Sequence, residues 1–350
     1  MSWKGRLSCL TRSIMSPGEP LVLMYHRVTD LEHDPWNIAV SPENFRQQMR
    51  ILSQTRKVVP LSTLVRETER GRGKGMIAIT FDDGYIDVYE KALPILHEFG
   101  CPATVFMVPG MLDRRHGFWW DELTRIVFAT PKLPVEFQFP DSLAVDDFTW
   151  SHKDGDADDR TRRSLYYALW RRLHDMEPGR RDEGLASIAD WAGVGLYDDP
   201  SDRAMSSTQA ARMASMDLIE IGAHTMTHPS LPTLSRDAQL QEMKASKRAC
   251  EEIVGSRVER FAYPFGDYNA DAIAAAREAG FAAAFTTKAG TMSMERSSLL
   301  FPRMNIGNYA PERFRFALAV NFAVPDALPL SVAERLRWAF PSLSALSLGI

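Results

Sequence analysis

The chain lacks several features that mark particular classes of protein. Its 350 residues include only three cysteines, Cys9, Cys101 and Cys250, and none belongs to a C-x-x-C pair. Neither a disulfide framework nor a cysteine-ligated zinc site is therefore expected. No segment reaches the roughly 18 uninterrupted apolar residues that a membrane span needs. The formal net charge of −4 argues against a strongly basic nucleic-acid binder.

The N-terminal segment also lacks the pattern of a secretory signal. Three basic residues precede Pro20, but no apolar stretch accompanies them. We therefore expect a cytoplasmic protein, with peripheral contact at the inner face of a membrane as the alternative. The mildly apolar residues 326–350 are expected to form a tail packed on the body of the protein.

What the chain does contain is a series of short apolar runs bounded by turn residues. Such runs are typical of strands buried on both faces, and helical patterns lie between them, which favours a parallel sheet. About seven strand–helix units would close more naturally as a barrel than as an open sheet. The runs are Leu21–His26, Met76–Phe81, Ala103–Val108, Ile219–His224, Arg260–Phe265, Ala283–Thr287 and Phe301–Ile306.

One long stretch interrupts this alternation. Between Val108 and Ile219 the strand–helix rhythm is lost, and the segment contains an amphipathic helical pattern at Leu165–Met176. We interpret residues 111–205 as an inserted helical subdomain, which could form a lid over a substrate. Residues 20–110 and 206–325 are then expected to form the barrel.

Two adjacent carboxylates follow the second apolar run, in Thr80-Phe81-Asp82-Asp83-Gly84. The carboxyl ends of parallel strands are where active sites of α/β proteins collect. Adjacent residues at a strand end point to different sides, so one carboxylate can bind a metal while the other remains free as a base. A turn whose aspartates only cap the next helix is the alternative.

Two histidines follow another strand, in His224-Thr225-Met226-Thr227-His228. At a spacing of four residues we expect them on one face of a helical turn, where they could share a divalent ion. Two histidines and one carboxylate make an open, catalytic type of zinc site.

A third motif is Tyr263-Pro264-Phe265-Gly266. It predicts a fixed turn that presents a backbone N–H as an oxyanion donor. A purely structural turn is the alternative.

Together these motifs resemble those of the polysaccharide deacetylases, the NodB-homology domain of carbohydrate esterase family four. The matching segments read T-F-D-D-G, H-T-M-T-H-P and F-A-Y-P-F-G-D-Y-N, in the family's order. The resemblance implies a distorted (β/α) barrel of about seven strands, one divalent metal, and removal of acetyl groups from N-acetylated sugars. It does not cover the insertion or about the last forty residues.

The resemblance also implies roles for individual residues. Asp82 would be the catalytic base, Asp83, His224 and His228 the metal ligands, and Phe265 the residue whose N–H stabilises the oxyanion. The family usually has an arginine where this chain has Ala262, so either Arg260 or Arg303 would orient Asp82. We expect Arg303.

A second departure concerns the catalytic acid. The family usually places it on a histidine near the C-terminus, whereas no histidine follows His228 in this chain. His26 ends an apolar run in L-M-Y-H-R-V, an arrangement similar to that of the circularly permuted poly-N-acetylglucosamine deacetylases. We therefore expect His26 to protonate the leaving amine.

Aromatic residues near these motifs are candidates for contact with sugar rings. They are Tyr85, Trp119, Trp120 and Tyr263, together with Pro264. The predicted function is metal-dependent N-deacetylation of an oligo- or polysaccharide, with zinc as the expected ion and cobalt, nickel or manganese as alternatives. A hydrolase of another C–N bond or of an O-acetyl ester, or a non-catalytic carbohydrate-binding module, are the alternative functions.

Overall fold

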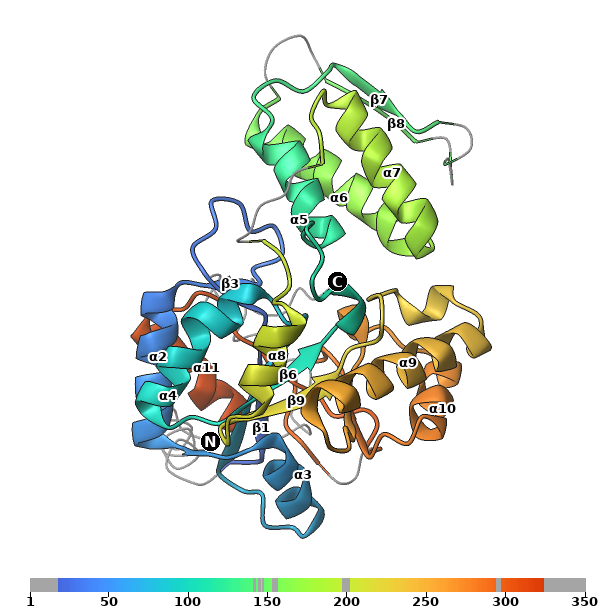
Figure 1. The fold of residues 1–350 in the computed structure, drawn as a ribbon. Coiled ribbons are helices and arrows are strands. Elements are labelled where there is room, and N and C mark those ends of the chain that lie inside the picture. The colour runs from blue at the N-terminus through green and yellow to red at the C-terminus, as the bar shows by residue number, and fades with distance from the viewer. Residues whose placement is uncertain are drawn as a thin grey trace, which may run out of the picture.

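The centre of the molecule is a curled parallel sheet (Figure 1). In this computed structural model, the described residues are 18–323 apart from 141–142, 144–145, 147, 153–156, 197–201 and 294–296. The strands follow the order β11-β10-β9-β6-β5-β1-β12, with β4 added beside β5. Their bounds are β1 Leu21–Tyr25, β4 Lys57–Val58, β5 Met76–Phe81, β6 Ala103–Met107, β9 Ile219–Ala223, β10 Arg260–Ala262, β11 Ala283–Phe285 and β12 Met304–Asn305.

The sheet curls far enough for its two edges to meet. Phe301, just before β12, forms a parallel bridge with Phe285 of β11, and its carbonyl oxygen accepts a hydrogen bond of 2.9 Å from the Thr286 N–H. The expected distorted (β/α) barrel of about seven strands is therefore confirmed.

Strand register brings the candidate catalytic residues to one edge of the sheet. Tyr25 of β1 pairs with Phe81 of β5, so His26 and Asp82 follow at the same level. Phe81 pairs in turn with Val105 of β6, the strand that lies beside β9 and therefore near His224. The apolar strands are buried along nearly their whole length, which explains why each appears in the sequence as a continuous hydrophobic run.

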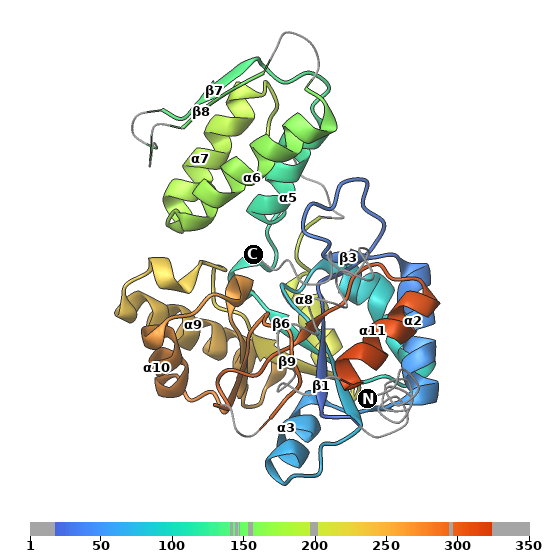
Figure 2. The same cartoon turned by 180° about the vertical axis from the view of Figure 1, so that it is seen from behind.

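Helices surround the sheet (Figures 1 and 2). The segment after β5 has a turn of π-helix at Val88–Ala92 that is followed directly by α4. Short 3₁₀ turns occur at Pro109–Met111, Leu231–Thr233 and Pro264–Gly266. The helices of the barrel are α2 Pro42–Thr55, α3 Leu61–Glu69, α4 Leu93–Phe99, α8 Ser207–Ala214, α9 Arg236–Val254, α10 Ala270–Glu278 and α11 Pro311–Ala323.

The segment between β6 and α8 forms a separate lobe above the barrel (Figures 1 and 2). The structure has helices in this insertion, and it adds an antiparallel pair of short strands that the sequence did not predict. Its elements are α5 Trp119–Thr124, a π-helical turn at Arg125–Ala129, β7 Glu136–Gln138, β8 Thr149–Ser151, α6 Asp159–Asp175 and α7 Pro178–Trp191.

The two ends of the insertion meet beside β2 (Arg27–Val28), which pairs with β3 (Ala39–Val40). A Cβ atom placed on Gly117 would lie only 2.7 Å from the carbonyl oxygen of Asp202, so the outgoing and returning chains are in contact. The fully buried Arg27 donates to Asp202 Oδ1 at 2.8 Å and to Asp87 Oδ2 at 2.9 Å, and lies 3.8 Å from Asp121 Oδ1. One arginine therefore holds both ends of the insertion against the barrel.

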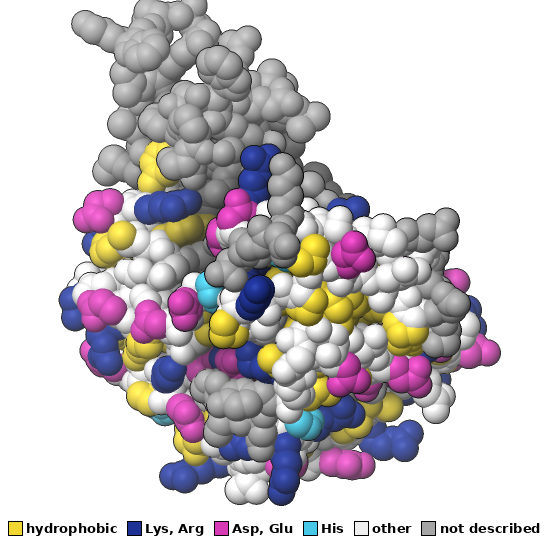
Figure 3. Space-filling model, turned by 90° about the horizontal axis from the view of Figure 1, so that it is seen from above, with side chains coloured by type: hydrophobic (Ala, Val, Ile, Leu, Met, Phe, Trp, Pro, Cys, Tyr) yellow, Lys and Arg dark blue, Asp and Glu magenta, His cyan; other side chains and the backbone are white. Residues whose placement is uncertain are grey.

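On the face seen in Figure 3 the described surface shows no concentration of one charge, and none of the described helices could span a membrane. Charged side chains of both signs are intermixed over the described surface seen in Figure 3. Among the described residues, every helix is too short or too polar to traverse a bilayer. Residues 1–17, which include Cys9, lie outside the described residues. So does the expected tail at 326–350.

Candidate metal centre and active site

Asp83, His224 and His228 form a compact group of metal-binding side chains. Asp83 Oδ1 lies 3.5 Å from His224 Nε2 and 3.2 Å from His228 Nε2, and the two Nε2 atoms are 3.2 Å apart. Three ligands about 2.1 Å from one ion at tetrahedral angles are about 3.4 Å apart from each other. The spacing therefore fits a single divalent ion.

The surroundings of this group also fit an ion. All three side chains are buried, and none of the described residues donates a hydrogen bond to Asp83 Oδ1. The His224 Nδ1 atom is 2.7 Å from the carbonyl oxygen of Ala262, a contact that orients its Nε2 toward the group. Burial lowers the pKa of His228 to about 4, which keeps this imidazole in the neutral form that binds metals.

The loop that carries the histidines differs from the predicted helical turn. Residues 224–230 are not helical, and Thr225 and His228 have φ values of 62° and 57°. Glu242 of α9 holds the loop, because its carboxylate accepts hydrogen bonds from the N–H groups of Met226 and Thr227 and from the Thr227 hydroxyl. A tertiary contact, rather than helical spacing, brings the two rings together.

Asp82, at the end of β5, faces an arginine that directly precedes β12, two strands away in the sheet. Arg303 Nη1 and Nη2 donate to Asp82 Oδ1 and Oδ2, each at 2.6 Å, and both side chains are buried. Arg260 instead lies beside Glu220, at 4.0 Å. Burial alone would raise the pKa of Asp82, but the Arg303 guanidinium and the nearby His224 and His26 together outweigh burial and lower it. Asp82 is therefore an ionised carboxylate beside the metal-binding group.

His26 lies beside Asp82 at the end of β1. The Asp82 N–H donates to the Tyr25 carbonyl oxygen at 3.0 Å, which fixes the relative positions of the two chain segments. His26 is partly exposed, and its Nδ1 atom is buried and without a partner among the described residues. Because this nitrogen is buried, a bound molecule would reach His26 through the other, partly exposed atoms of the side chain.

Phe265 occupies the turn that follows β10. Its φ of 59° is unusual for a residue with a side chain, and Asp83, with a φ of 72°, shares this feature. The Phe265 N–H donates to no atom of the described residues, and the Phe265 ring contacts that of His228 at 4.5 Å. The turn thus packs Phe265 against one of the metal-binding side chains.

Comparison with known proteins agrees with this geometry. Residues 69–132 and 195–284 match the family model described as polysaccharide deacetylase. This chain belongs to the polysaccharide deacetylase family. The Bacillus subtilis protein named "Putative polysaccharide deacetylase YxkH" is 26% identical to this family member over 137 residues. That match covers 38% of this chain and 47% of YxkH, so it spans less than half of the relative.

Two solved structures share the fold of this family member. The Streptococcus pyogenes deacetylase PplD, solved in complex with acetate, is 19% identical, with a TM-score of 0.56 over 88% of this chain and 100% of its own. IcaB from Ammonifex degensii is 18% identical, with a TM-score of 0.53 over 88% of this chain and 98% of its own. At these identities the similarity establishes a common fold.

Among the aromatic residues singled out in the sequence of this polysaccharide deacetylase family member, Trp120 lies against a metal-binding side chain, whereas Tyr85 and Tyr263 lie in the interior. Trp120 contacts the His228 ring at 4.8 Å and donates from Nε1 to the Tyr85 hydroxyl at 2.7 Å. Tyr85 is fully buried and donates in turn to Asp121. Tyr263 is also buried, with its hydroxyl on the Leu299 carbonyl oxygen, and Pro264 is buried beside it. Tyr85 and Tyr263 therefore support the site from within.

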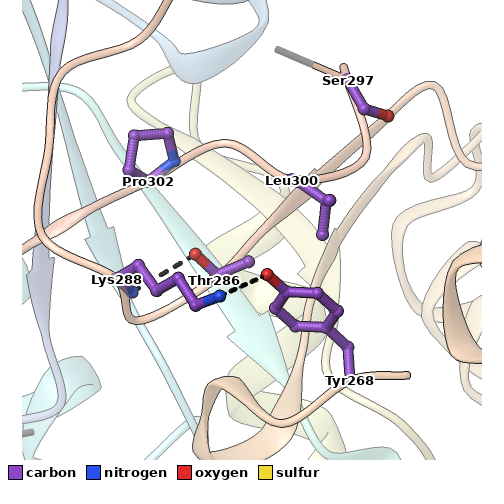
Figure 4. Close-up of a pocket in the computed structure, with 6 residues that line it drawn as sticks. All are labelled: Tyr268, Thr286, Lys288, Ser297, Leu300 and Pro302. Carbon is purple, nitrogen blue, oxygen red and sulfur yellow. Dashed lines mark hydrogen bonds between the residues drawn. The ribbon is translucent and has the colours of Figure 1, made fainter. Parts of the chain in front are cut away.

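A pocket lies on the rim of the barrel at the end of β11 (Figure 4). Its walls include Tyr268, Thr286 and Lys288, and the Lys288 ammonium donates to the Tyr268 hydroxyl at 2.7 Å. The Thr286 carbonyl oxygen accepts from Arg303 Nε at 3.1 Å. The pocket therefore shares Thr286 with the surroundings of the Arg303–Asp82 pair.

His174 is a residue that the motif analysis did not select. It lies on α6 of the insertion, with its Nε2 atom 3.1 Å from Asp267 Oδ2 in the turn after β10. Its ring stacks on Trp170 and contacts Phe265 at 4.6 Å. Burial would lower the pKa of His174, but Asp267 and Asp175 together raise it. An ion pair thus joins the insertion to the barrel above the site.

Replacing His174 with Gln is expected to destabilise the protein in a pH-dependent manner. Because the pKa of His174 is raised on folding, its contribution is complete below the unfolded value of about 6.5 and is lost as pH rises through the folded pKa. The pKa of Asp267 is lowered although burial opposes this, so its contribution is present above about 3.9 and is lost at more acidic pH. The pair is therefore strongest between about pH 4 and 6.5.

Near pH 5.5 we expect the free energy of unfolding of His174→Gln to be about 1 kcal/mol below that of the wild type. The effect is no larger because the Asp267 side chain is 39% exposed and solvent weakens the pair. Urea unfolding at pH 5.5 and 8.5 measures it. The exposed His116, replaced by Gln in the same way, is the control and should show no such difference. An equal loss for His174→Gln at both pH values would show that packing, and not charge, holds the two parts together.

Proposed function

We propose that this protein is a metal-dependent hydrolase that removes N-acetyl groups from amino sugars of an oligo- or polysaccharide. One observation carries the proposal. An ionised aspartate, held by Arg303 through both carboxylate oxygens, lies beside three buried side chains whose spacing fits one divalent ion. Such a site pairs a base with a metal, as amide hydrolysis requires.

A divalent ion held by Asp83, His224 and His228 would lower the pKa of a water molecule from about 15.7 toward 7 and polarise the amide carbonyl. Asp82 accepts the proton of the attacking water. The Phe265 N–H donates to the oxygen on which negative charge develops. His26 gives a proton to the sugar nitrogen as the C–N bond breaks. The products are acetate and a free amine.

The sugar class rests on two kinds of support. The order of the motifs, with His26 before Asp82, resembles the branch typified by poly-N-acetylglucosamine deacetylases. Trp120 lies against His228, and Trp119 lies next to it at 5.5 Å, so the insertion places flat rings beside the reacting centre. Aromatic rings of this kind suit the apolar faces of sugars. N-acetylglucosamine chains, or a surface-glycan precursor, are the proposed substrates.

Acetate release from a panel of N-acetylated oligosaccharides tests the proposal. The protein is stripped of metal and then supplied with Zn²⁺, Co²⁺, Ni²⁺ or Mn²⁺ in turn. Release that requires a metal supports the proposal, and the most active ion identifies the cofactor, with zinc expected. Release only from O-acetyl esters would replace it with an esterase. Glycan binding without metal and without release would indicate a binding module.

Replacement of His228 by Gln is expected to weaken metal binding by at least about 100-fold, because loss of even an indirect partner of a metal ligand costs 10- to 100-fold. Metal content after dialysis, measured by mass spectrometry, should be one ion per chain in the wild type and near zero in the variant. His97→Gln, at an exposed position of α4, is the matched control. Equal metal content in both variants would remove His228 from the ligand set.

A further inference from the structure

Arg181 is a buried cation in the insertion that none of the sequence motifs includes. It lies on α7 and is 4% exposed, whereas its neighbours Arg180 and Asp182 are exposed. Its guanidinium lies over the ring of Trp119, at 5.4 Å from the ring centroid. The helix therefore turns this one charged side chain inward, toward the first helix of the insertion.

The hydrogen-bond donors at this place are not used. Among the described residues, the buried Arg181 Nε and Nη1 have no hydrogen-bond partner, and neither does the buried Nε1 of Trp119. No carboxylate of the described residues lies within the 4.0 Å of an ion pair with Arg181. Buried donors are nearly always paired, and an unpaired charged donor is strongly unfavourable. Two side chains in contact, each with an unused donor, indicate that an acceptor from outside the chain completes the group.

The charge of the site specifies what kind of acceptor fits. Burial lowers the pKa of Arg181 to about 10, so it remains a cation at neutral pH. Asp182 and Glu242 are nearby carboxylates, but Asp182 is exposed, and the Glu242 oxygens already accept hydrogen bonds from the loop that holds His228. Arg114 adds a second positive charge in the neighbourhood. An anion therefore suits the site better than a neutral hydroxyl.

This donor group lies beside the metal-binding residues. Trp119 contacts Trp120, and Trp120 contacts the ring of His228 at 4.8 Å. Burial is the main cause of the low pKa of His228, and the charge of Arg181 contributes to it, which places the two side chains within electrostatic reach. Two indole rings therefore connect Arg181 to the metal-binding group.

We propose that Arg181 and the indole N–H of Trp119 bind an acidic group, a carboxylate or a phosphate, carried by the glycan on which the enzyme acts. The family model matches residues 69–132 and 195–284, so Arg181 falls in the segment between them and is a feature of this chain's insertion. The link to the glycan rests on the proposed function, whereas anion binding itself depends only on the insertion.

Titration calorimetry with three monosaccharide probes tests the proposal. The probes are N-acetylglucosamine, N-acetylglucosamine 6-phosphate and 2-acetamido-2-deoxyglucuronic acid. The Asp83→Asn protein is used alongside the wild type, so that phosphate binding to a metal ion cannot produce the signal. We expect an acidic probe to bind at least about tenfold more tightly than the neutral one. The tighter of the two acidic probes identifies the anion.

Variants of the full chain locate the effect. Arg181→Gln should abolish the preference for the acidic probe, and Arg181→Lys should retain part of it because the charge remains. Arg171→Gln removes the same charge from an exposed position of α6 and should leave the preference intact. Equal binding of acidic and neutral probes by the wild type, or equal losses in Arg181→Gln and Arg171→Gln, would overturn the proposal.

Acetate release separates this inference from the proposed function. Release from neutral N-acetylglucosamine oligomers without any preference for acidic glycans would leave the hydrolase in place and overturn the anion site. Arg181-dependent binding of an acidic probe without acetate release from any glycan would support the anion site and contradict the hydrolase.

Discussion

Replacing Asp82 with Asn is expected to lower kcat for acetate release by about 10²- to 10⁴-fold, the usual contribution of a positioned base. An amide has the shape of the carboxylate but cannot accept the proton of the attacking water. The three metal-binding side chains are untouched, so metal content should remain at one ion per chain. Steady-state kinetics and metal analysis on the same preparation measure both quantities.

The variant also leaves the buried Arg303 without its carboxylate partner. Breaking a buried ion pair of this kind costs about 3–5 kcal/mol, so the variant should unfold at a lower temperature. Adding Arg303→Met removes the unpaired charge and should restore stability but not activity. That double variant separates loss of chemistry from loss of fold. Activity within about tenfold of wild type in Asp82→Asn would show that another group is the base.

Replacing His26 with Gln is the second change with a large expected effect. Without a proton donor the sugar nitrogen is a poor leaving group, so release from N-acetyl sugars should fall by about 10²- to 10⁴-fold. For 4-nitrophenyl acetate the deficit should shrink to less than about tenfold, because a nitrophenolate leaves without a proton. Comparing the two substrates therefore reports on the acid itself and not on folding or metal binding.

His116→Gln, at an exposed position, is the control for the His26 variant and should behave like wild type on both substrates. Equal deficits on the amide and on the ester would assign His26 a role in metal or substrate binding. No deficit on either would direct attention to His174, whose ring also faces the turn at Phe265.

The sheet could be predicted because its strands are buried on both faces. Leu21–Tyr25 and Met76–Phe81 are continuous apolar runs, and nothing in their neighbourhoods competes with a strand assignment. β7 and β8 escaped prediction because they are three residues each, with one buried or partly buried residue between two exposed ones. Packing within the insertion, rather than a local pattern, makes them strands.

The motifs predict which residues form the site, but they do not predict which of these residues contact each other. Arg260 and Arg303 are both candidate partners of Asp82 in the sequence, with Arg303 expected, and the strand order β5-β1-β12 is what places Arg303 within reach of Asp82. The histidine loop was wrongly expected to be helical, because the control exerted by Glu242 comes from a separate helix. Arg181 and His174 carry no sequence signal, since each is one polar residue on an amphipathic helix.

The contact between Gly117 and Asp202 has a consequence for how such enzymes diversify. Because Arg27 holds the outgoing and returning chains at one point, the residues between them can change in length or composition without displacing His26 or Asp82. A segment whose ends already touch adds little chain-closure entropy when it is lengthened or replaced. Recombination, or grafting in the laboratory, could therefore exchange the insertion as a unit while the barrel is inherited unchanged.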